Sequence, residues 1–180
     1  MRIIILRVAP FSFTEPLYKI GEGLTKAFHG VTCIVAEEAI PIPRRAFNPQ
    51  RKQYHSTVIL RKICNYSKEL ICDRVLGVAE VDLYVPQLNF VFGEAVFNGR
   101  GALISLHRLR PEFYGEPASE KVLYERSVKE AVHEIGHTFG LTHCDNKNCV
   151  MFFSNSIIDT DRKKASFCGK CDALAKKKLE

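Results

Sequence analysis

The stretch HEIGHTFGLTHC, residues 133–144, constrains the fold of this chain more than any other part of the sequence. His133 and His137 are four residues apart, so on a helix they lie on one face with Cβ atoms about 5–6 Å apart. Two imidazoles placed in this way can bind one metal ion without any change of the backbone. Gly140 suits a left-handed helix end, and beyond it His143 can approach from another direction. The spacing therefore predicts three nitrogen ligands and a fourth coordination position for water.

Glu134 follows the first histidine and is turned from it by about 100° around a helix. Its carboxylate can reach a water molecule on the open side of the metal, which is the place of the general base in H-E-x-x-H sites. Three protein ligands and one open position are typical of a catalytic metal site rather than a structural one. Ordinary histidines on an exposed helix face are the alternative, and the fixed offsets of Gly140 and His143 argue against it.

Four of the seven cysteines lie in the last 37 residues and form two close pairs, Cys144 with Cys149 and Cys168 with Cys171. Four thiolates in two such pairs predict a closed tetrahedral zinc site, which is structural because it has no open position. A redox-active Cys168-x-x-Cys171 and a disulfide are the alternatives, and the presence of the second pair favours zinc. His143 and Cys144 would then bind different ions, and we hypothesise that the structural zinc holds His143 in place.

These motifs together resemble those of a known family. The extended signature of the metzincin metallopeptidases is matched at every position, by His133, Glu134, His137, Gly140 and His143. The four cysteines and Met151 narrow the resemblance to the archaemetzincins, with a dense match over residues 133–171. The gap of sixteen residues before Cys168 is about one residue shorter than in that family, which changes a loop and no ligand.

The resemblance implies a zinc-dependent peptidase with two zinc ions per chain, one catalytic and one structural. It makes Met151 the methionine of the turn beneath the three histidines, although a gap-filling role in the core predicts the same burial. Some metzincins have a tyrosine two residues later that can reach the metal; this chain has Phe153 there, so we expect water as the fourth ligand. A tyrosine that stabilises the oxyanion would have to come from elsewhere in the chain; Tyr114 and Tyr124 are candidates, and the sequence does not choose between them.

We expect the substrate to lie extended along an antiparallel edge strand, which the resemblance places near residues 90–96. Glu134 would take a proton from water and pass it to the leaving amine. Whether cleavage is endo- or exopeptidic stays open. Four apolar side chains could line a specificity pocket or belong to the core: Phe152, Phe153, Ile157 and Ile158.

Apolar periodicity predicts strands and helices that alternate along most of the chain. Strands are expected at 2–9, 30–38 and 75–85 and on both sides of a turn at 98–101, and helices at 14–28, 55–72 and 119–140. Residues 40–53, with three prolines and four basic side chains, are expected to form an exposed connection.

The predicted fold class is α/β (α+β), a metzincin-like single domain. It has a twisted, mixed five-stranded sheet with one antiparallel edge strand, helices that back the sheet, and an irregular zinc-stabilised C-terminal segment. Residues 1–140 would form a platform that ends in the active-site helix. Residues 141–180 would form a C-terminal subdomain with the third histidine ligand, the methionine turn and the four cysteines.

Composition and charge exclude several classes of protein. No apolar run approaches the roughly 18–20 residues that span a bilayer, and the start MRIIILRVAP has too short an apolar stretch for a signal peptide, so we expect a cytoplasmic location. The net charge is +6, but Arg44–Arg45, Lys163–Lys164 and the tail from Lys176 are scattered, and we expect them to be solvated surface. The remaining cysteines are expected to be buried small hydrophobes: Cys33, Cys64 and Cys72.

Two functions are compatible with these motifs. The first is a zinc-dependent peptidase that acts on a peptide or protein, and the second is a zinc-binding domain that recognises peptides with little or no turnover. Glu134 favours the first, because a three-histidine site without hydrolytic activity has no need of a carboxylate there. A nucleic-acid adaptor is disfavoured because no recognition helix, stacking aromatics or glycine-rich loop accompanies the basic charge. We expect a monomer with no membrane or nucleic-acid partner.

Overall fold

The centre of the molecule is a five-stranded sheet with the order β2-β1-β5-β8-β7, in a computed structural model that describes residues 1–179. Four strands run parallel, and β7 runs antiparallel to β8 at one edge. The predicted mixed sheet is confirmed, and its antiparallel edge strand lies within the expected residues 90–96. The strands are β1 (Arg2–Ala9), β2 (Thr32–Pro41), β5 (Arg74–Ala79), β7 (Gly93–Ala95) and β8 (Gly101–Ser105).

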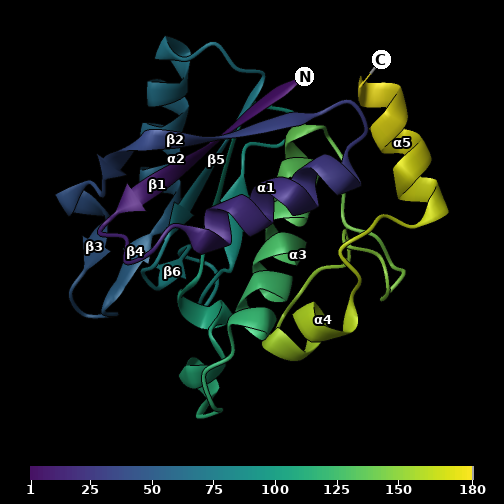
Figure 1. Cartoon of the computed structure of the whole chain (residues 1–180). Coiled ribbons are helices and arrows are strands. Elements are labelled where there is room, and N and C mark those ends of the chain that lie inside the picture. The colour runs from purple at the N-terminus through teal and green to yellow at the C-terminus, as the bar shows by residue number, and fades with distance from the viewer. Residues whose placement is uncertain (180) are drawn as a thin grey trace.

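Successive side chains of the central strands point to opposite faces of the sheet, so they build two apolar cores. One core lies under α1 (Glu15–Ala27) and α3 (Glu120–Thr138), which Figure 1 shows together on one side of the sheet. The other core lies under α2 (Ser56–Tyr66). In β8, for example, Ala102 and Ile104 belong to the first core and Leu103 belongs to the second.

The single strand predicted over residues 75–85 is wrong, because β5 ends at Ala79. Just beyond it, Glu80 pairs with Arg110, and Asp82 accepts two hydrogen bonds from Arg108 at 2.6 and 2.8 Å. Charged side chains of this kind do not continue a fully buried central strand. The chain instead enters a small three-stranded sheet made of β3 (Phe47–Asn48), β4 (Gln53–His55) and β6 (Leu83–Tyr84).

Residues 40–53 are mostly exposed, as predicted, but they are more ordered than a simple connection. They contain the short 3-10 helix Arg44–Ala46 and the strand β3, and Gln53 at their end is buried. The Gln53 amide donates to Asp82 and to the carbonyl of Asn89, so this connection is fixed to the loop before β7.

Several predicted boundaries also differ. The helix expected at 55–72 ends at Tyr66 and continues only as the 3-10 helix Ser67–Glu69. The strand expected beyond the turn at 98–101 ends at Ser105, where the chain forms 3-10 helices at His107–Leu109 and Pro111–Tyr114. The ends of helices and strands depend on local hydrogen bonds and are the hardest feature to predict from a sequence.

The segment after residue 140 is more regular than predicted, since it contains α4 (Ile157–Arg162) and α5 (Gly169–Leu179). A capping box of Ser156 and Asp159 begins α4. Val150 and Met151 are fully buried in the same core as α3, so this segment packs directly on the rest of the chain. These contacts do not test the division at residue 140, which stays a prediction.

Two expectations about exposure are wrong. Lys163, expected on the solvated surface, is 1% exposed, whereas Lys164 and the described tail residues Lys176 to Lys178 are exposed as predicted. Cys33, Cys64 and Cys72 are only half-buried, although the first two do pack against the apolar cores.

Candidate active site

Helix α3 holds the first two predicted ligands in a fixed orientation. It begins as predicted at Ser119, whose hydroxyl accepts a hydrogen bond from the Val122 amide at 3.4 Å. Buried apolar side chains then anchor its inner face to the sheet. It ends at Thr138, and Gly140 has a φ of +76°, the left-handed conformation expected at a helix end. The chain turns there and brings His143 back over the helix.

The structure brings the three predicted histidine ligands together, with one ring nitrogen of each within 4.8 Å of the others. His133 Nδ1 donates to the Val150 carbonyl at 2.8 Å, and His137 Nδ1 donates to the Leu141 carbonyl at 2.7 Å. Since both Nδ1 atoms carry the proton, both Nε2 atoms have free lone pairs, and these atoms are 3.1 Å apart. Tetrahedral zinc with Zn–N bonds of about 2.0–2.1 Å would separate two ligand nitrogens by about 3.3 Å. The donor set therefore fits zinc.

Burial also favours the neutral form of these rings, which is the form that binds a metal. It lowers the pKa of His133 well below its ordinary value, and it lowers the pKa values of His137 and His143 as well. The nearby Lys163 acts in the same direction on all three. Little proton competition at neutral pH is therefore expected at this site.

Glu134 is buried and lies beside the histidine cluster at the wall of a cleft. Burial raises the pKa of its carboxyl well above the ordinary value, and the nearby Glu130 raises it further, against an opposing effect of Lys163. The edge strand approaches this carboxyl very closely at Gly93, where a Cβ atom would lie 2.6 Å from Glu134 Cγ. Gly93 therefore lets β7 and Glu134 share one wall of the cleft. Sequence reasoning missed it, because its only signal is the absence of a side chain.

Met151 packs directly beneath the active-site helix. It is fully buried, and a Cβ atom on Gly136 would lie only 2.6 Å from its sulfur. The burial predicted for Met151 is confirmed. Gly136, inside the motif itself, was not singled out by sequence reasoning, although a glycine in a helix interior is a signal of close packing.

The four predicted cysteine ligands also meet, with their sulfur atoms within 4.8 Å of one another. Cys144 Sγ and Cys168 Sγ are 3.8 Å apart, which excludes a disulfide between them. The same distance of about 3.8 Å is expected between two thiolates on tetrahedral zinc with Zn–S bonds of about 2.3 Å. The backbone amide of Cys171 lowers the pKa of Cys168 to about 7, whereas burial raises the pKa of Cys149. The donor set fits a structural zinc.

The two clusters are joined by one short stretch of backbone. His143 belongs to the histidine cluster and Cys144 to the cysteine cluster. The Cys144 amide donates to the Met151 carbonyl at 2.9 Å, so this stretch is also fixed to the buried methionine.

The other residues singled out from the sequence have mixed positions. Phe153 lines the cleft, and its ring centroid is 4.8 Å from that of His143. Phe152 is half-buried, Ile157 packs against the core, as the alternative interpretation expected, and Ile158 is 65% exposed. Of the four residues, Phe153 alone lines this cleft.

Neither candidate tyrosine reaches the cleft. The Tyr114 hydroxyl donates to the Arg108 carbonyl at 2.8 Å, and Tyr124 lies near Glu120 and Glu15. No tyrosine is among the described residues that line the cleft, so the expectation of an oxyanion-stabilising tyrosine at 114 or 124 is wrong.

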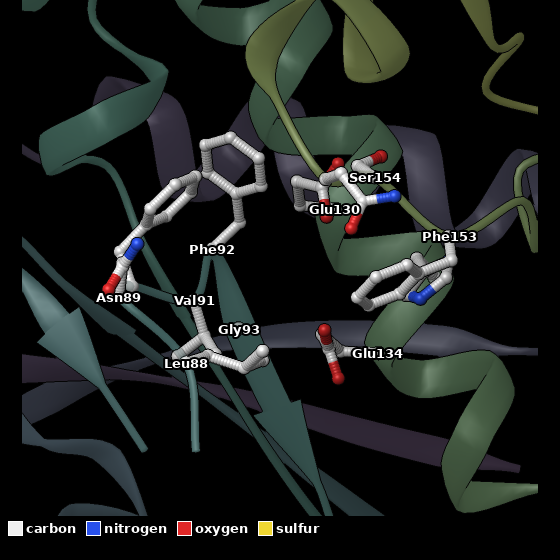
Figure 2. A pocket seen from close by; sticks show the side chains of 12 residues that line it. Leu88, Asn89, Val91, Phe92, Gly93, Glu130, Glu134, Phe153 and Ser154 are labelled. Atoms are coloured by element: carbon white, nitrogen blue, oxygen red, sulfur yellow. The ribbon is translucent and has the colours of Figure 1, made fainter. Parts of the chain in front are cut away.

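The cleft has a volume of about 220 Å³ and lies between the loop before β7, helix α3 and the segment after Met151. Figure 2 shows aromatic side chains on both of its sides, with Glu134 at one end and Glu130 near the other. None of the helices formed by residues 1–179 has the length and apolar character to cross a membrane. The cleft is lined by Leu88, Asn89, Phe90, Val91, Phe92, Gly93, Glu130, His133, Glu134, Phe153, Ser154 and Asn155.

Comparisons with known proteins agree with this geometry. The sequence pattern of Peptidase family M54 matches residues 24–177. The archaemetzincin of Methanocaldococcus jannaschii is 57% identical over 132 residues, which are 73% of this chain and 71% of that protein. The crystal structure of archaemetzincin from Methanopyrus kandleri has a TM-score of 0.88 and 34% identity, over 99% of this chain and 95% of that one. A zinc-dependent peptidase from Methanocorpusculum labreanum has a TM-score of 0.85 and 32% identity, over 96% and 99% of the two chains.

Proposed function

The chain belongs to Peptidase family M54 and is a zinc metallopeptidase of the archaemetzincin type, and from this we propose which of its residues carry out the reaction. His133, His137 and His143 would hold the catalytic zinc through their ring nitrogens. The structural zinc would be held by Cys144, Cys149, Cys168 and Cys171. Gly140 and Met151 support the first site from the turn and from below.

Glu134 is the proposed general base. When bound, zinc polarises the scissile carbonyl and brings the pKa of water toward about 7. The Glu134 carboxylate takes the proton of the attacking water and returns it to the leaving amine. Its raised pKa suits this double role, because a general base works best when its pKa is near the operating pH.

The edge strand β7 is the proposed binding surface for the substrate backbone. It is the last strand of the sheet, so one of its edges has no strand partner within residues 1–179. An extended peptide can add to such an edge through main-chain hydrogen bonds. Gly93 of this strand contacts Glu134, so a peptide bound there would pass the proposed base.

The observation that carries this proposal is the position of Glu134, buried between the histidine cluster and β7. The test compares wild type with Glu134→Gln for metal content and for cleavage of a peptide library. We expect two zinc ions per chain in both proteins and a fall in kcat/KM of about 10²–10⁴-fold in the variant. Bound zinc together with peptide binding and no cleavage by wild type would favour the alternative, a recognition domain without turnover.

We also propose a monomeric, cytoplasmic protein with no nucleic-acid partner. The absence of a recognition motif in the sequence supports the last point. Light scattering after gel filtration tests the oligomeric state, and cell fractionation tests the location. The proposed boundary near residue 140 is tested by limited proteolysis with and without a chelator, because loss of the structural zinc should expose the C-terminal part first.

A further inference from the structure

A buried ion pair lies at one end of the cleft. Lys163 Nζ is 3.0 Å from Glu130 Oε1, and the two side chains are 0% and 3% exposed. Thr160 Oγ1 donates to the same oxygen of Glu130 at 2.9 Å. The Lys163 ammonium is not aligned for a hydrogen bond, so its contact with Glu130 is chiefly electrostatic. The pair has no net charge, and none of the steps assigned to Glu134 uses it.

Ser154 Oγ, at this end of the cleft, is buried and has no hydrogen-bond partner among the described residues. The contacts of Glu130 with Thr160 and Lys163 are both made by Oε1, so its second carboxylate oxygen can accept a hydrogen bond from a ligand. Both residues line the cleft, and in the view of Figure 2 they lie between Phe92 and Phe153. Buried polar atoms are nearly always paired, so the unpaired Ser154 hydroxyl, in the same cleft as an available carboxylate oxygen of Glu130, points to a ligand group that can bond to both.

The walls of the cleft are apolar and aromatic. Phe90 and Phe92 meet edge to face with ring centroids 5.1 Å apart, and Leu88 and Phe153 complete the walls. A cleft of about 220 Å³ has room for one large side chain. Aromatic rings prefer offset or edge-to-face contacts with other aromatic rings, which these walls offer.

We propose that this cleft selects peptides with a tyrosine next to the scissile bond, and that Glu130 and Ser154 are specificity-determining residues that bind its hydroxyl. This inference rests on the proposed function, because it places the substrate beside Glu134. The phenol ring fills the aromatic part of the cleft, and its hydroxyl donates to Glu130 and accepts from Ser154. A tyrosine hydroxyl can do both at once.

The charges at this end of the cleft favour a tyrosine of the substrate over a lysine or an arginine. Lys163 already neutralises Glu130, so a second cation would be buried without a carboxylate of its own, which is unfavourable. Phenylalanine would fill the same space but leave both polar atoms unpaired. The hydrogen bond between the tyrosine hydroxyl and the charged Glu130 should therefore favour tyrosine over phenylalanine by about tenfold or more.

The test uses zinc-loaded protein and capped peptides that differ at one position, with tyrosine, phenylalanine or lysine. Mass spectrometry locates the cleaved bond, and kcat/KM is compared between peptides. Binding of the same peptides to the zinc-loaded Glu134→Gln protein gives a second measure that does not depend on turnover. We expect cleavage next to tyrosine and a preference of about tenfold over phenylalanine in both measures.

The variant that tests the assignment is the double substitution Glu130→Leu with Lys163→Met. It replaces the whole ion pair by apolar side chains, which is often neutral for stability, whereas Glu130→Gln alone would leave a buried charge without its partner. In this variant the ratio of kcat/KM for the tyrosine peptide to that for the phenylalanine peptide should fall to about one, even if both rates change. Lys129→Met is the matched control: Lys129 is on the same helix and bonds to carbonyls of α4, but it does not line the cleft, so the preference should persist.

Equal treatment of tyrosine and phenylalanine by wild type, or a preference for lysine, would overturn the inference and leave the peptidase function intact. A tyrosine preference that survives in the double variant would overturn the role of Glu130. Selective binding of tyrosine peptides without any cleavage would support the cleft assignment and overturn the proposed function instead. Failure to bind any peptide would overturn both.

Discussion

Gly136→Ala places a methyl group into the contact between the active-site helix and Met151. The new Cβ would lie 2.6 Å from the Met151 sulfur and 3.2 Å from its methyl carbon. Ordinary contact begins at 3.4 Å, so the sulfur has to retreat by about 0.8 Å. Met151 is fully buried and has little free space into which it can move.

The expected change in stability is the difference of two opposing effects. Overpacking of a core costs about 1–3 kcal/mol, and Gly→Ala inside a helix stabilises by about 0.5–1 kcal/mol. The net loss in the free energy of unfolding should therefore be between about 0 and 2.5 kcal/mol. Metal affinity should fall as well, because the Val150 carbonyl next to Met151 orients His133. Disturbing such a supporting contact typically lowers metal affinity about 10–100-fold.

Urea unfolding and chelator competition measure the two effects. Gly21→Ala is the control, since Gly21 lies inside helix α1 away from both metal clusters, and its Cβ would meet its neighbours only at 3.5 Å, an ordinary contact. A Met151→Ala background removes the colliding atoms, so there Gly136→Ala should be stabilising by about 0.5–1 kcal/mol. Full helix-propensity stabilisation in the wild-type background, with unchanged zinc affinity, would refute the reasoning.

Two further predictions concern Glu134. In metal-free protein the raised pKa of Glu134 means that this carboxyl holds its proton in the folded state at pH values above about 4.5 where it has lost it in the unfolded state, so the contribution of Glu134 to stability falls as the pH rises above 4.5. Glu134→Gln cannot titrate, so urea unfolding should show that the stability of the variant relative to wild type increases as the pH rises above 4.5, by about 1.4 kcal/mol per unit of pKa shift. A difference that stays constant with pH would contradict this. Gly93→Ala would bring a Cβ 2.6 Å from Glu134 Cγ and 2.7 Å from the Leu103 carbonyl, so kcat/KM should fall by about 10²-fold while metal analysis still finds two zinc ions per chain.

The metal ligands were readable from the sequence because their chemistry is local. Residue spacing on one helix places His133 and His137 together, and a glycine turn returns His143, so no knowledge of the rest of the fold is needed. The parallel part of the sheet was readable because buried strands and amphipathic helices differ in period and alternate along the chain. The antiparallel strand followed from a direct connection without a helix, and its place at the edge came from the resemblance to the metzincins.

The cleft was not readable, because its residues come from three separate segments. Glu130 lies on the same helix as the ligands, but it looks like an ordinary surface glutamate until α4 brings Lys163 and Thr160 against it. Lys163 was assigned to the surface because a lysine pair normally is solvated. Only the tertiary packing of α4 shows that one lysine of the pair is buried and the other exposed.

His143 and Cys144 are neighbours in the sequence, so one short stretch of backbone positions a ligand of each metal site. His143 has no hydrogen bond to its ring within residues 1–179, unlike His133 and His137, each of which is held by a backbone carbonyl. Its position therefore depends on its backbone. The next residue, Cys144, fixes this backbone through its thiolate in the cysteine cluster and through the hydrogen bond that its amide donates to the Met151 carbonyl. Loosening the cysteine site should thus weaken the histidine site.

Cys144→Ser tests this dependence directly. The variant loses one thiolate of the structural site, and we expect zinc affinity at the histidine site to fall about tenfold as well, as for loss of other supporting contacts. Chelator competition in a His133→Ala background identifies which zinc is being followed. Cys33→Ser is the matched control, because Cys33 is half-buried in β2 and belongs to neither cluster. If the histidine-site affinity is the same in Cys144→Ser and Cys33→Ser, His143 is held by its own turn, and the structural zinc stabilises only the C-terminal segment.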